Sequence, residues 1–379
     1  MENFQVEVLV PGPVPVSPEV LSAMSHPVPV HYGPGYVPFY KALIGKLQKV
    51  FFTTNPVFPF GGSGSAAVDA ALGTLMGLDK HAAVIVNGFF AERLTTMARG
   101  YDPDALEIRL EWGKVPDPAD IAKFLDKNRV DVLAVVQSET SSGVLNPIKE
   151  LAAVARERGV ALMVDGVGSV GGVPLKMDEW GVAASATASQ KCLESAPGLG
   201  IATLSDIGWK VVDSQKRPTP GWYLNLRNWR AYWSENPDWH PYPVTVATNN
   251  LMALDQSVNR VLAEGLEARY ERHRRVTSHV RSLLRERGFT LLAEDGWAST
   301  TVTVAFPPAD IGAADLANTL RTEYGMFIGG GLEHLSGKAI RVGHLGPSAN
   351  EFVQNRLFAA IDAVMAKMRA KAPQTAAHR

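Results

Sequence analysis

The stretch SATASQKCLESAPGLGIA, residues 185–202, contains a single lysine, Lys191, between two strand-like runs. Lysine is usually a solvated surface residue, but this one lies among small residues, with Pro and Gly close behind it. Small residues allow other groups to approach the backbone closely. The pattern therefore indicates that the amine of Lys191 has a chemical role.

Strand-like and helical segments alternate along the chain around this lysine. The strand-like runs are short and apolar, and the segments between them show the apolar spacing of amphipathic helices. This alternation is typical of a parallel sheet covered by helices, so we expect an α/β fold. The predicted strands are residues 82–88, 130–137, 160–166, 183–189 and 199–205, and the predicted helices are residues 65–77, 118–129 and 148–159.

The pattern changes after about residue 248. A long charged helical stretch runs to residue 288, and a smaller set of strand-like and helical segments follows it. A chain of 379 residues with 46% hydrophobic content is longer than a single core usually supports. We therefore predict an N-terminal arm (1–20), a large domain (21–250) and a small C-terminal α+β domain (251–379), with a frayed tail at 372–379.

The composition excludes several classes of function. The charges nearly cancel, with 37 Lys and Arg against 38 Asp and Glu, so the chain lacks the basic footprint of a nucleic-acid binder. No apolar span is long enough to suggest a membrane partner. The only cysteine, Cys192, excludes an intrachain disulfide and fits the cytoplasm. His31, His240 and His344 lack the spacing of metal ligands, so we expect no metal site.

A Gly/Ser loop opens directly into a helical pattern in FPFGGSGSAAVDAAL, residues 58–72. The first amides of a helix have no partner within the helix, and the helix dipole favours negative charge there. Ser63, Gly64 and Ser65 could therefore hold a phosphate. Most loops of this kind bind nothing, so the loop alone does not decide the matter.

Asp165 follows an apolar strand-like run at the point where that run ends. The carboxyl ends of strands in a doubly wound sheet face the ligand crevice, although a loop aspartate can equally serve as a cap. Lys191 follows the next strand-like run. A phosphate cradle, an acid and an isolated lysine are together what pyridoxal phosphate requires, because the lysine binds its aldehyde and the acid holds its ring nitrogen protonated.

The lysine segment ASQKCLESAPGLG, residues 188–200, resembles the lysine motif of the class V, fold-type I pyridoxal-phosphate aminotransferases, in the alanine–glyoxylate and serine–glyoxylate group. This resemblance implies a large domain with a mixed, mostly parallel sheet flanked by helices and a smaller C-terminal α+β domain. It covers nearly the whole chain in order. The other similar stretches are residues 11–24, 62–72, 86–93, 138–148, 163–181, 223–233 and 340–346.

The resemblance also implies a role for each matching residue. Lys191 would form the Schiff base with the cofactor and later move the substrate proton. Asp165 would pair with the pyridinium nitrogen, and Val167 and Phe90 would contact opposite faces of the ring. Arg341 would receive the substrate carboxylate, because a planar two-pronged donor fits a planar anion. The remaining roles are phosphate binding by Ser63, Gly64, Ser65 and Gln190, a position near the ring oxygen for Thr140, and a place on the substrate side for Gly12.

Two segments depart from the family's pattern. In many relatives a threonine and a tyrosine reach the phosphate bound by the neighbouring subunit, but the aligned residues here are Pro241 and Asp238. Either His240 or Tyr242 substitutes for them, or phosphate binding is looser. In the stretch HYGPGY, Tyr32 replaces a basic residue. Both changes concern the substrate more than the cofactor.

The resemblance implies a homodimeric aminotransferase. Its amino donor would be a small amino acid of the alanine, serine or aspartate type, and its acceptor would be glyoxylate or pyruvate. One alternative is a lyase that uses the same cofactor for β-elimination, or for decarboxylation with deamination, on an amino-acid conjugate in a biosynthetic pathway. A second alternative is a non-catalytic binding protein that keeps the fold, although Lys191, Asp165 and Arg341 together argue against it.

Overall fold

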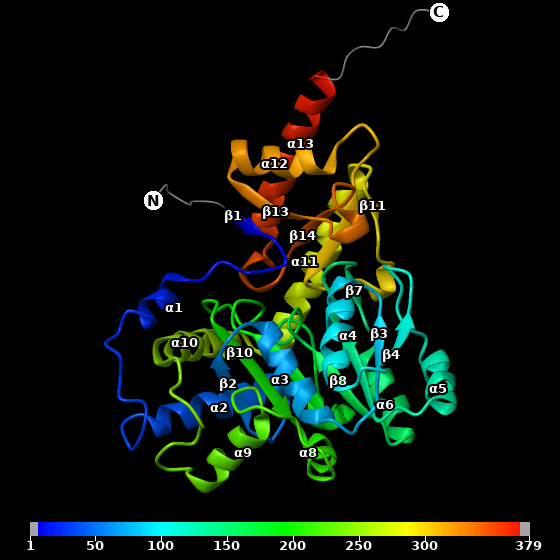
Figure 1. Ribbon diagram of the computed structural model, residues 1–379. Helices are drawn as coiled ribbons and strands as arrows, with labels where there is room; N and C mark the ends of the chain where they lie inside the picture. The colour runs from blue at the N-terminus through cyan, green and yellow to red at the C-terminus, as the bar shows by residue number, and fades with distance from the viewer. Residues whose placement is uncertain (1–6, 372–379) are drawn as a thin grey trace, which may run out of the picture.

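A seven-stranded sheet forms the centre of the large domain in the computed structural model, which describes residues 7–371 (Figure 1). The strands lie in the order β2-β10-β9-β8-β5-β3-β4. The five strands from β9 to β4 run parallel, whereas β10 is antiparallel to both of its neighbours. The strands are β2 (Val57–Gly61), β3 (Ala82–Val86), β4 (Leu106–Arg109), β5 (Val132–Val136), β8 (Ala161–Asp165), β9 (Ala184–Ala188) and β10 (Leu199–Leu204).

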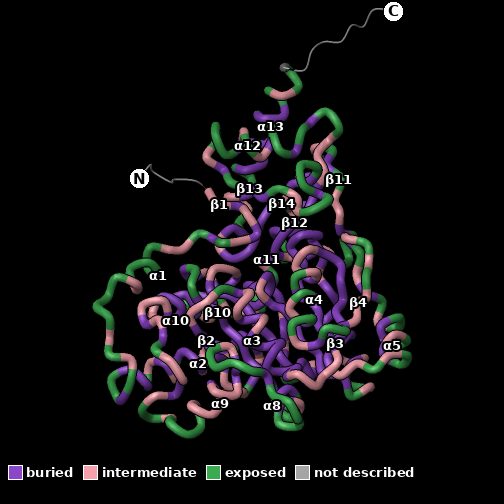
Figure 2. The backbone as a smooth tube through the Cα atoms, in the orientation of Figure 1, coloured by how far each residue is buried: buried purple, intermediate pink, exposed green. Residues whose placement is uncertain are grey.

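All five strands predicted from the sequence are present in this sheet, and the mixed, mostly parallel arrangement is confirmed. The central strands β3, β5, β8 and β9 are buried along their whole length (Figure 2). This burial explains the apolar sequences of β3, β5 and β8 and the small residues of β9, because helices cover both faces of such sheets. The edge strand β4 is only partly buried and carries charged residues, and the sequence did not predict it.

Helices pack around the large sheet, with α3 and α4 in front of it in the view of Figure 1. The predicted helices 65–77, 118–129 and 148–159 correspond to α3, α5 and α6. A two-stranded ribbon, β6 (Ser138–Glu139) and β7 (Val144–Leu145), follows β5. The helices are α1 (Pro18–Ala23), α2 (Val37–Phe51), α3 (Gly64–Met76), α4 (Phe89–Tyr101), α5 (Pro118–Lys127), α6 (Ile148–Glu157), α7 (Met177–Trp180), α8 (Asp206–Asp213), α9 (Leu226–Glu235) and α10 (Thr248–Glu264).

The small domain is built on a second sheet, with the strand order β1-β13-β14-β12-β11. Its first strand comes from the N-terminal end of the described chain and lies parallel to β13. The strands are β1 (Glu7–Leu9), β11 (Thr290–Leu291), β12 (Val302–Phe306), β13 (Met326–Gly330) and β14 (Ile340–Gly343), and the helices are α11 (Leu266–Glu286), α12 (Ala313–Tyr324) and α13 (Glu351–Lys371), with short 3-10 turns at Asp295–Trp297, Glu333–Leu335 and Gly346–Ser348.

The charged helical stretch predicted from residue 248 is two helices that join at Gly265. Gly265 has a φ of 83°, a conformation that favours glycine and ends α10. Residues of α10, including Leu251 and Leu254, belong to the core of the large domain, whereas Val276 of α11 belongs to the core of the small domain. The α10–α11 junction therefore links the two cores. The domain division at residues 20 and 250 stays a prediction.

Within residues 7–371, no helix has the length and apolar character needed to cross a membrane. The tail predicted to fray, residues 372–379, lies outside the described residues.

Candidate active site

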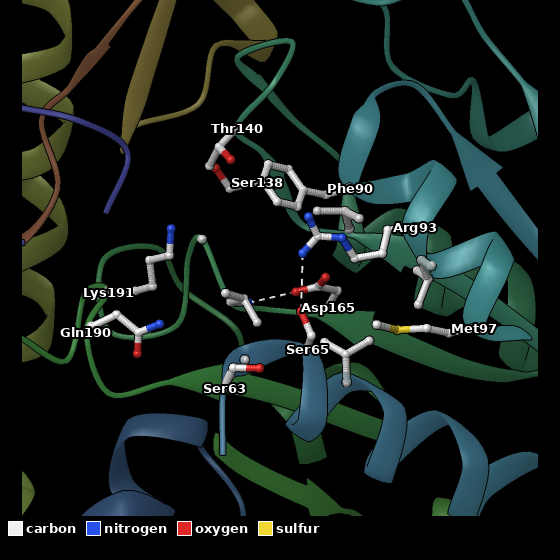
Figure 3. A pocket seen from close by; sticks show the side chains of 16 residues that line it. Ser63, Ser65, Phe90, Arg93, Met97, Ser138, Thr140, Asp165, Gln190 and Lys191 are labelled. Atoms are coloured by element: carbon white, nitrogen blue, oxygen red, sulfur yellow. Dashed lines mark hydrogen bonds between the residues drawn. The ribbon is translucent and has the colours of Figure 1, made fainter. Parts of the chain in front are cut away.

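Two adjoining cavities lie at the carboxyl end of the large sheet. Phe90, Thr140 and Lys191 line both of them. Figure 3 shows the first cavity, with Lys191 and Gln190 on one side, Phe90 and Arg93 on the other, and Ser63 and Ser65 at the start of α3. All nine residues predicted to bind the cofactor line this first cavity: Ser63, Gly64, Ser65, Phe90, Thr140, Asp165, Val167, Gln190 and Lys191.

Asp165 is the last residue of β8 and projects into the first cavity. One of its carboxylate oxygens accepts a hydrogen bond from the backbone N–H of Val167 at 2.9 Å. Burial raises the pKa of Asp165 to about 6, although that hydrogen bond and the charges of Lys191 and Arg93 act in the opposite direction. A carboxylate held in this way is ready to accept a cationic N–H, because such a partner would restore the charged form.

Lys191 lies in the turn that follows β9. Burial lowers the pKa of its amine, which increases the fraction of the neutral, nucleophilic form. The Nζ atom of Lys191 donates to the backbone carbonyl of Pro11. Gly12 has a φ of 97°, and a β-carbon there would lie 2.5 Å from the Lys191 side chain. Only glycine therefore fits beside this lysine.

The N-terminus of α3 forms one wall of the first cavity. Ser63 is the N-cap, and its hydroxyl accepts a hydrogen bond from the backbone N–H of Ala66 at 3.4 Å. Gly64 packs so closely on Val167 that a β-carbon would lie 2.9 Å from its methyl group. The backbone N–H groups and the dipole at this helix end favour an anion.

Arg93 is a residue of the first cavity that the sequence analysis missed. It lies one helical turn after Phe90 on α4, and its guanidinium carbon is 5.0 Å from the centre of the Phe90 ring. Its Nη1 atom donates to the hydroxyl of Ser65 at 3.2 Å (Figure 3). The sequence held a signal for this residue, because positions i and i+3 of a helix share one face.

A second missed residue, Glu139, holds the start of α4. Burial raises the pKa of Glu139 to about 7, although hydrogen bonds favour its charged form. Its two carboxylate oxygens accept from the backbone N–H groups of Ser141, at 3.0 Å, and of Ala91, at 2.9 Å. The second contact caps the helix that carries Phe90, so Glu139 helps to place that ring.

The second cavity lies between the N-terminal segment and the small domain. Gly12 and Arg341, both predicted to lie on the substrate side, line it together with Phe327. Arg341 donates from Nε to the carbonyl of Gly330 at 2.6 Å and from Nη1 to the carbonyl of Thr140 at 3.4 Å. Burial lowers the pKa of Arg341. Its described hydrogen-bond partners are carbonyls, so its charge suits a carboxylate ligand.

The two segments that depart from the family's pattern lie side by side. The His240 ring is 4.7 Å from that of Tyr242 and 5.5 Å from that of His31, and Tyr32 contacts Trp239. Asp238 pairs with Lys41 at the surface. Among the described residues of this one chain, these side chains are not part of either cavity lining.

His344 and Cys192 have packing roles. His344 is fully buried, and its two ring nitrogens lie 2.9 Å from the hydroxyl of Thr303 and 3.2 Å from that of Thr277. Burial lowers the pKa of His344 to about 4. Cys192 is buried against Val14 and Leu345. Burial raises the pKa of its thiol to about 12, which makes it a poor nucleophile.

The architecture described above, a mixed sheet with its cavity at the strand ends and a smaller sheet beside it, is that of the fold-type I aminotransferases. A solved structure of an alanine–glyoxylate aminotransferase from Nostoc sp. superimposes with a TM-score of 0.90, shares 30% identity and covers 95% of each chain.

Sequence comparison shows which family of fold-type I aminotransferases the chain resembles. The family profile described as Aminotransferase class-V matches residues 63–342. An uncharacterised aminotransferase of Methanocaldococcus jannaschii is 36% identical over 89% of this chain and 87% of its own length. The (S)-ureidoglycine–glyoxylate transaminase of Bacillus subtilis is 31% identical over 94% of this chain and 90% of its own length. The chain belongs to the class-V aminotransferase family, and the resemblance inferred from the lysine motif is confirmed.

Proposed function

We propose that this aminotransferase uses pyridoxal phosphate to move an amino group from a small amino acid, such as alanine, serine or aspartate, to glyoxylate or pyruvate. One observation carries the proposal: the amine of Lys191 and the carboxylate of Asp165 line a single cavity that opens at the N-terminus of α3. A nucleophilic amine, an acid and an anion site in one cavity match the three functional groups of this cofactor. The glyoxylate acceptors named for the relatives support the choice of acceptor.

When bound, pyridoxal phosphate would supply an aldehyde for the Lys191 amine and a ring that withdraws electrons from the substrate. Asp165 would hold a proton on the ring nitrogen, and its buried position strengthens that charged pair. Val167 and Phe90 would fix the plane of the ring. Ser63, Gly64, Ser65 and Gln190 would bind the phosphate, and Thr140 would lie near the ring oxygen.

Arg341 would orient the substrate through its carboxylate, with Gly12 leaving room beside the lysine. The Lys191 amine would be the base that accepts the proton from the substrate Cα. Burial lowers the pKa of this amine, which supports that role, because an amine accepts a proton only in its neutral form.

We also propose a homodimer in the cytoplasm. The aromatic cluster around His240, Tyr242 and Tyr32 includes the strongly exposed Trp239. Exposed aromatic groups of this kind mark interaction sites. In a dimer, this cluster would supply the contacts to the partner's cofactor phosphate that Asp238 and Pro241 cannot make.

The absorption spectrum of the purified protein with added pyridoxal phosphate tests the proposal. We expect a band near roughly 410–430 nm that reports the covalent bond to Lys191. Lys191→Ala should abolish this band, whereas Lys123→Ala, which changes an exposed lysine, should leave it unchanged.

Adding an amino donor without an oxo acid should remove the band, and glyoxylate or pyruvate should restore it. Release of pyruvate and ammonia without any acceptor would instead favour a lyase. A folded protein that shows no band at any cofactor concentration would refute the assignment of Lys191.

A further inference from the structure

An arginine outside both cavities ties together the two turns that carry Lys191 and follow Asp165. Arg269 lies in the first turn of α11, and its side chain is 2% exposed. Its Nε donates to the carbonyl of Gly171 at 2.6 Å, and its Nη2 donates to the carbonyl of Cys192 at 2.7 Å. Gly171 belongs to the turn after Asp165, and Cys192 is the residue next to Lys191.

Two carboxylates complete the surroundings of this guanidinium. Glu194, in the lysine turn, accepts from Nη2, and Glu264, at the end of α10, accepts from Nη1 at 2.8 Å. A buried cation is stable only when it is paired and its donors are satisfied. All three nitrogen atoms of Arg269 have such partners, so the side chain is firmly held in one arrangement.

The turn that contains Gly171 and the turn that contains Cys192 meet directly beside the Arg269 guanidinium. Gly171 has a φ of 89°, and a β-carbon there would lie 3.2 Å from the carbonyl oxygen of Cys192. The turns therefore meet backbone to backbone. The planar guanidinium supplies the carbonyls of Gly171 and Cys192 with two donors from one rigid fork.

We propose that Arg269 is a positioning residue that fixes the turn of Lys191 against the turn of Asp165 and joins both to the small domain. The anchoring stands on the contacts above, and its catalytic consequence rests on the proposed function. The small domain also carries Arg341, which would bind the substrate carboxylate. Arg269 therefore fixes the position of the Lys191 amine relative to both Asp165 and Arg341.

The reactivity of Cys192 can show whether Arg269 holds the two turns together. Cys192 is the only cysteine, it is 0% exposed, and the position of a β-carbon on Gly172 would lie 2.6 Å from its sulfur atom. A thiol reagent can reach it only when the lysine turn separates from the groups that cover the sulfur, which are the turn after Asp165, Val14 and Leu345. The rate of Cys192 modification in the native protein therefore measures opening around the lysine turn without any cofactor or substrate.

The test compares Arg269→Lys with Arg272→Lys. Both variants keep the charge and weaken contacts to Glu264, but Arg272 donates to the carbonyls of Gly346 and Ala349 and not to the two turns. We expect Arg269→Lys to accelerate modification of Cys192 by about 10-fold or more, because the lost charge-assisted hydrogen bonds shift the opening equilibrium. Arg272→Lys should stay within about 2-fold of the unchanged protein.

A spectroscopic readout separates positioning from general loosening. In the protein loaded with pyridoxal phosphate, Arg269→Lys should move the pH midpoint of the visible band upward by about half a unit or more, since a looser turn exposes the Lys191 nitrogen to water and favours its protonated form. Its kcat should fall while the KM of the amino donor stays nearly constant. Circular dichroism and the thermal midpoint establish that each variant is folded.

If Arg269→Lys does not fold, Glu194→Gln replaces it, because this change removes one partner and leaves the guanidinium on both carbonyls. We then expect about a 3-fold faster modification. Unchanged modification of Cys192 in the folded variant, or equal acceleration in Arg272→Lys, overturns the proposal. Faster modification in a protein that forms no visible band supports the anchor and refutes the proposed function.

Discussion

At the scale of the residue, burial decides the properties of the two central groups. The amine of Lys191 and the carboxylate of Asp165 both have pKa values displaced toward their neutral forms by desolvation. Displaced pKa values of this kind cluster at functional sites, because catalysis needs groups near the point of proton exchange. The protein thus carries an energetic cost at Asp165 that a bound cationic ring would relieve.

The pH dependence of stability follows from this cost. The pKa of Asp165 is about 6 in the folded protein and near 4 when unfolded, so the folded state binds the proton more tightly and loses stability as pH rises from about 4 to 6. Asp165→Asn should therefore stabilise the cofactor-free protein by up to about 3 kcal/mol above pH 6, and the gain should vanish near pH 4. Denaturant unfolding at pH 4 and 7.5 measures this difference.

A carboxylate with the opposite displacement provides the control. The side-chain hydrogen bond from Arg369 lowers the pKa of Asp310, so Asp310→Asn should bring no gain at pH 7.5. Asp165→Asn should also bind pyridoxal phosphate about 10-fold or more weakly, because it loses the ion pair to the ring. If Asp165→Asn were no more stable at pH 7.5 than the unchanged protein, burial of the Asp165 carboxylate would not carry the free-energy cost assigned to it.

At the scale of the element, the N-terminus of α3 has a cap that stabilises the helix and, in the proposed function, the site of the cofactor phosphate. Ser63 caps the helix, and removal of such a cap costs about 1 kcal/mol. Ser205 caps α8 in the same way through the backbone N–H of Gly208, away from the cavity lining. Ser63→Ala and Ser205→Ala should therefore lower stability by similar amounts, whereas only Ser63→Ala should weaken cofactor binding, by about 10-fold. Thermal unfolding and a cofactor titration separate the two effects, and equal affinities would exclude a phosphate role for Ser63.

At the scale of the whole molecule, the aromatic cluster exposes two large neighbouring side chains in the single chain. Trp239 is 59% exposed and contacts Tyr32, which is 43% exposed. Trp239→Asp should shift the mass measured by light scattering from two chains toward one and reduce cofactor affinity, because a charge in an apolar interface is costly. Trp297→Asp changes an exposed tryptophan of the small domain and should leave the mass unchanged. A protein that is already a single chain before mutation would refute the dimer.

The sequence alone determined the family and several elements around the cavity, namely α3, β8 and β9, whereas α4 and β2 were not predicted. The strands β3, β5 and β8 are apolar runs and β9 is a run of small residues; Asp165 ends β8 and Lys191 lies in the turn after β9, so local patterns were sufficient to predict their places. The motif around Lys191 identified the family because its residues are close together in the chain. Edge strand β4 escaped prediction, since a partly solvated strand does not need an apolar sequence.

Only the tertiary structure decided which distant residues meet. The carbonyl of Pro11 reaches Lys191 across 180 positions of the chain, and Arg341 reaches Thr140 across 201. β1 completes the small sheet beside β13, and Arg269 bridges two turns of the other domain. These contacts depend on how the two sheets pack and on the course of the chain between them, and no local pattern of residues encodes that course.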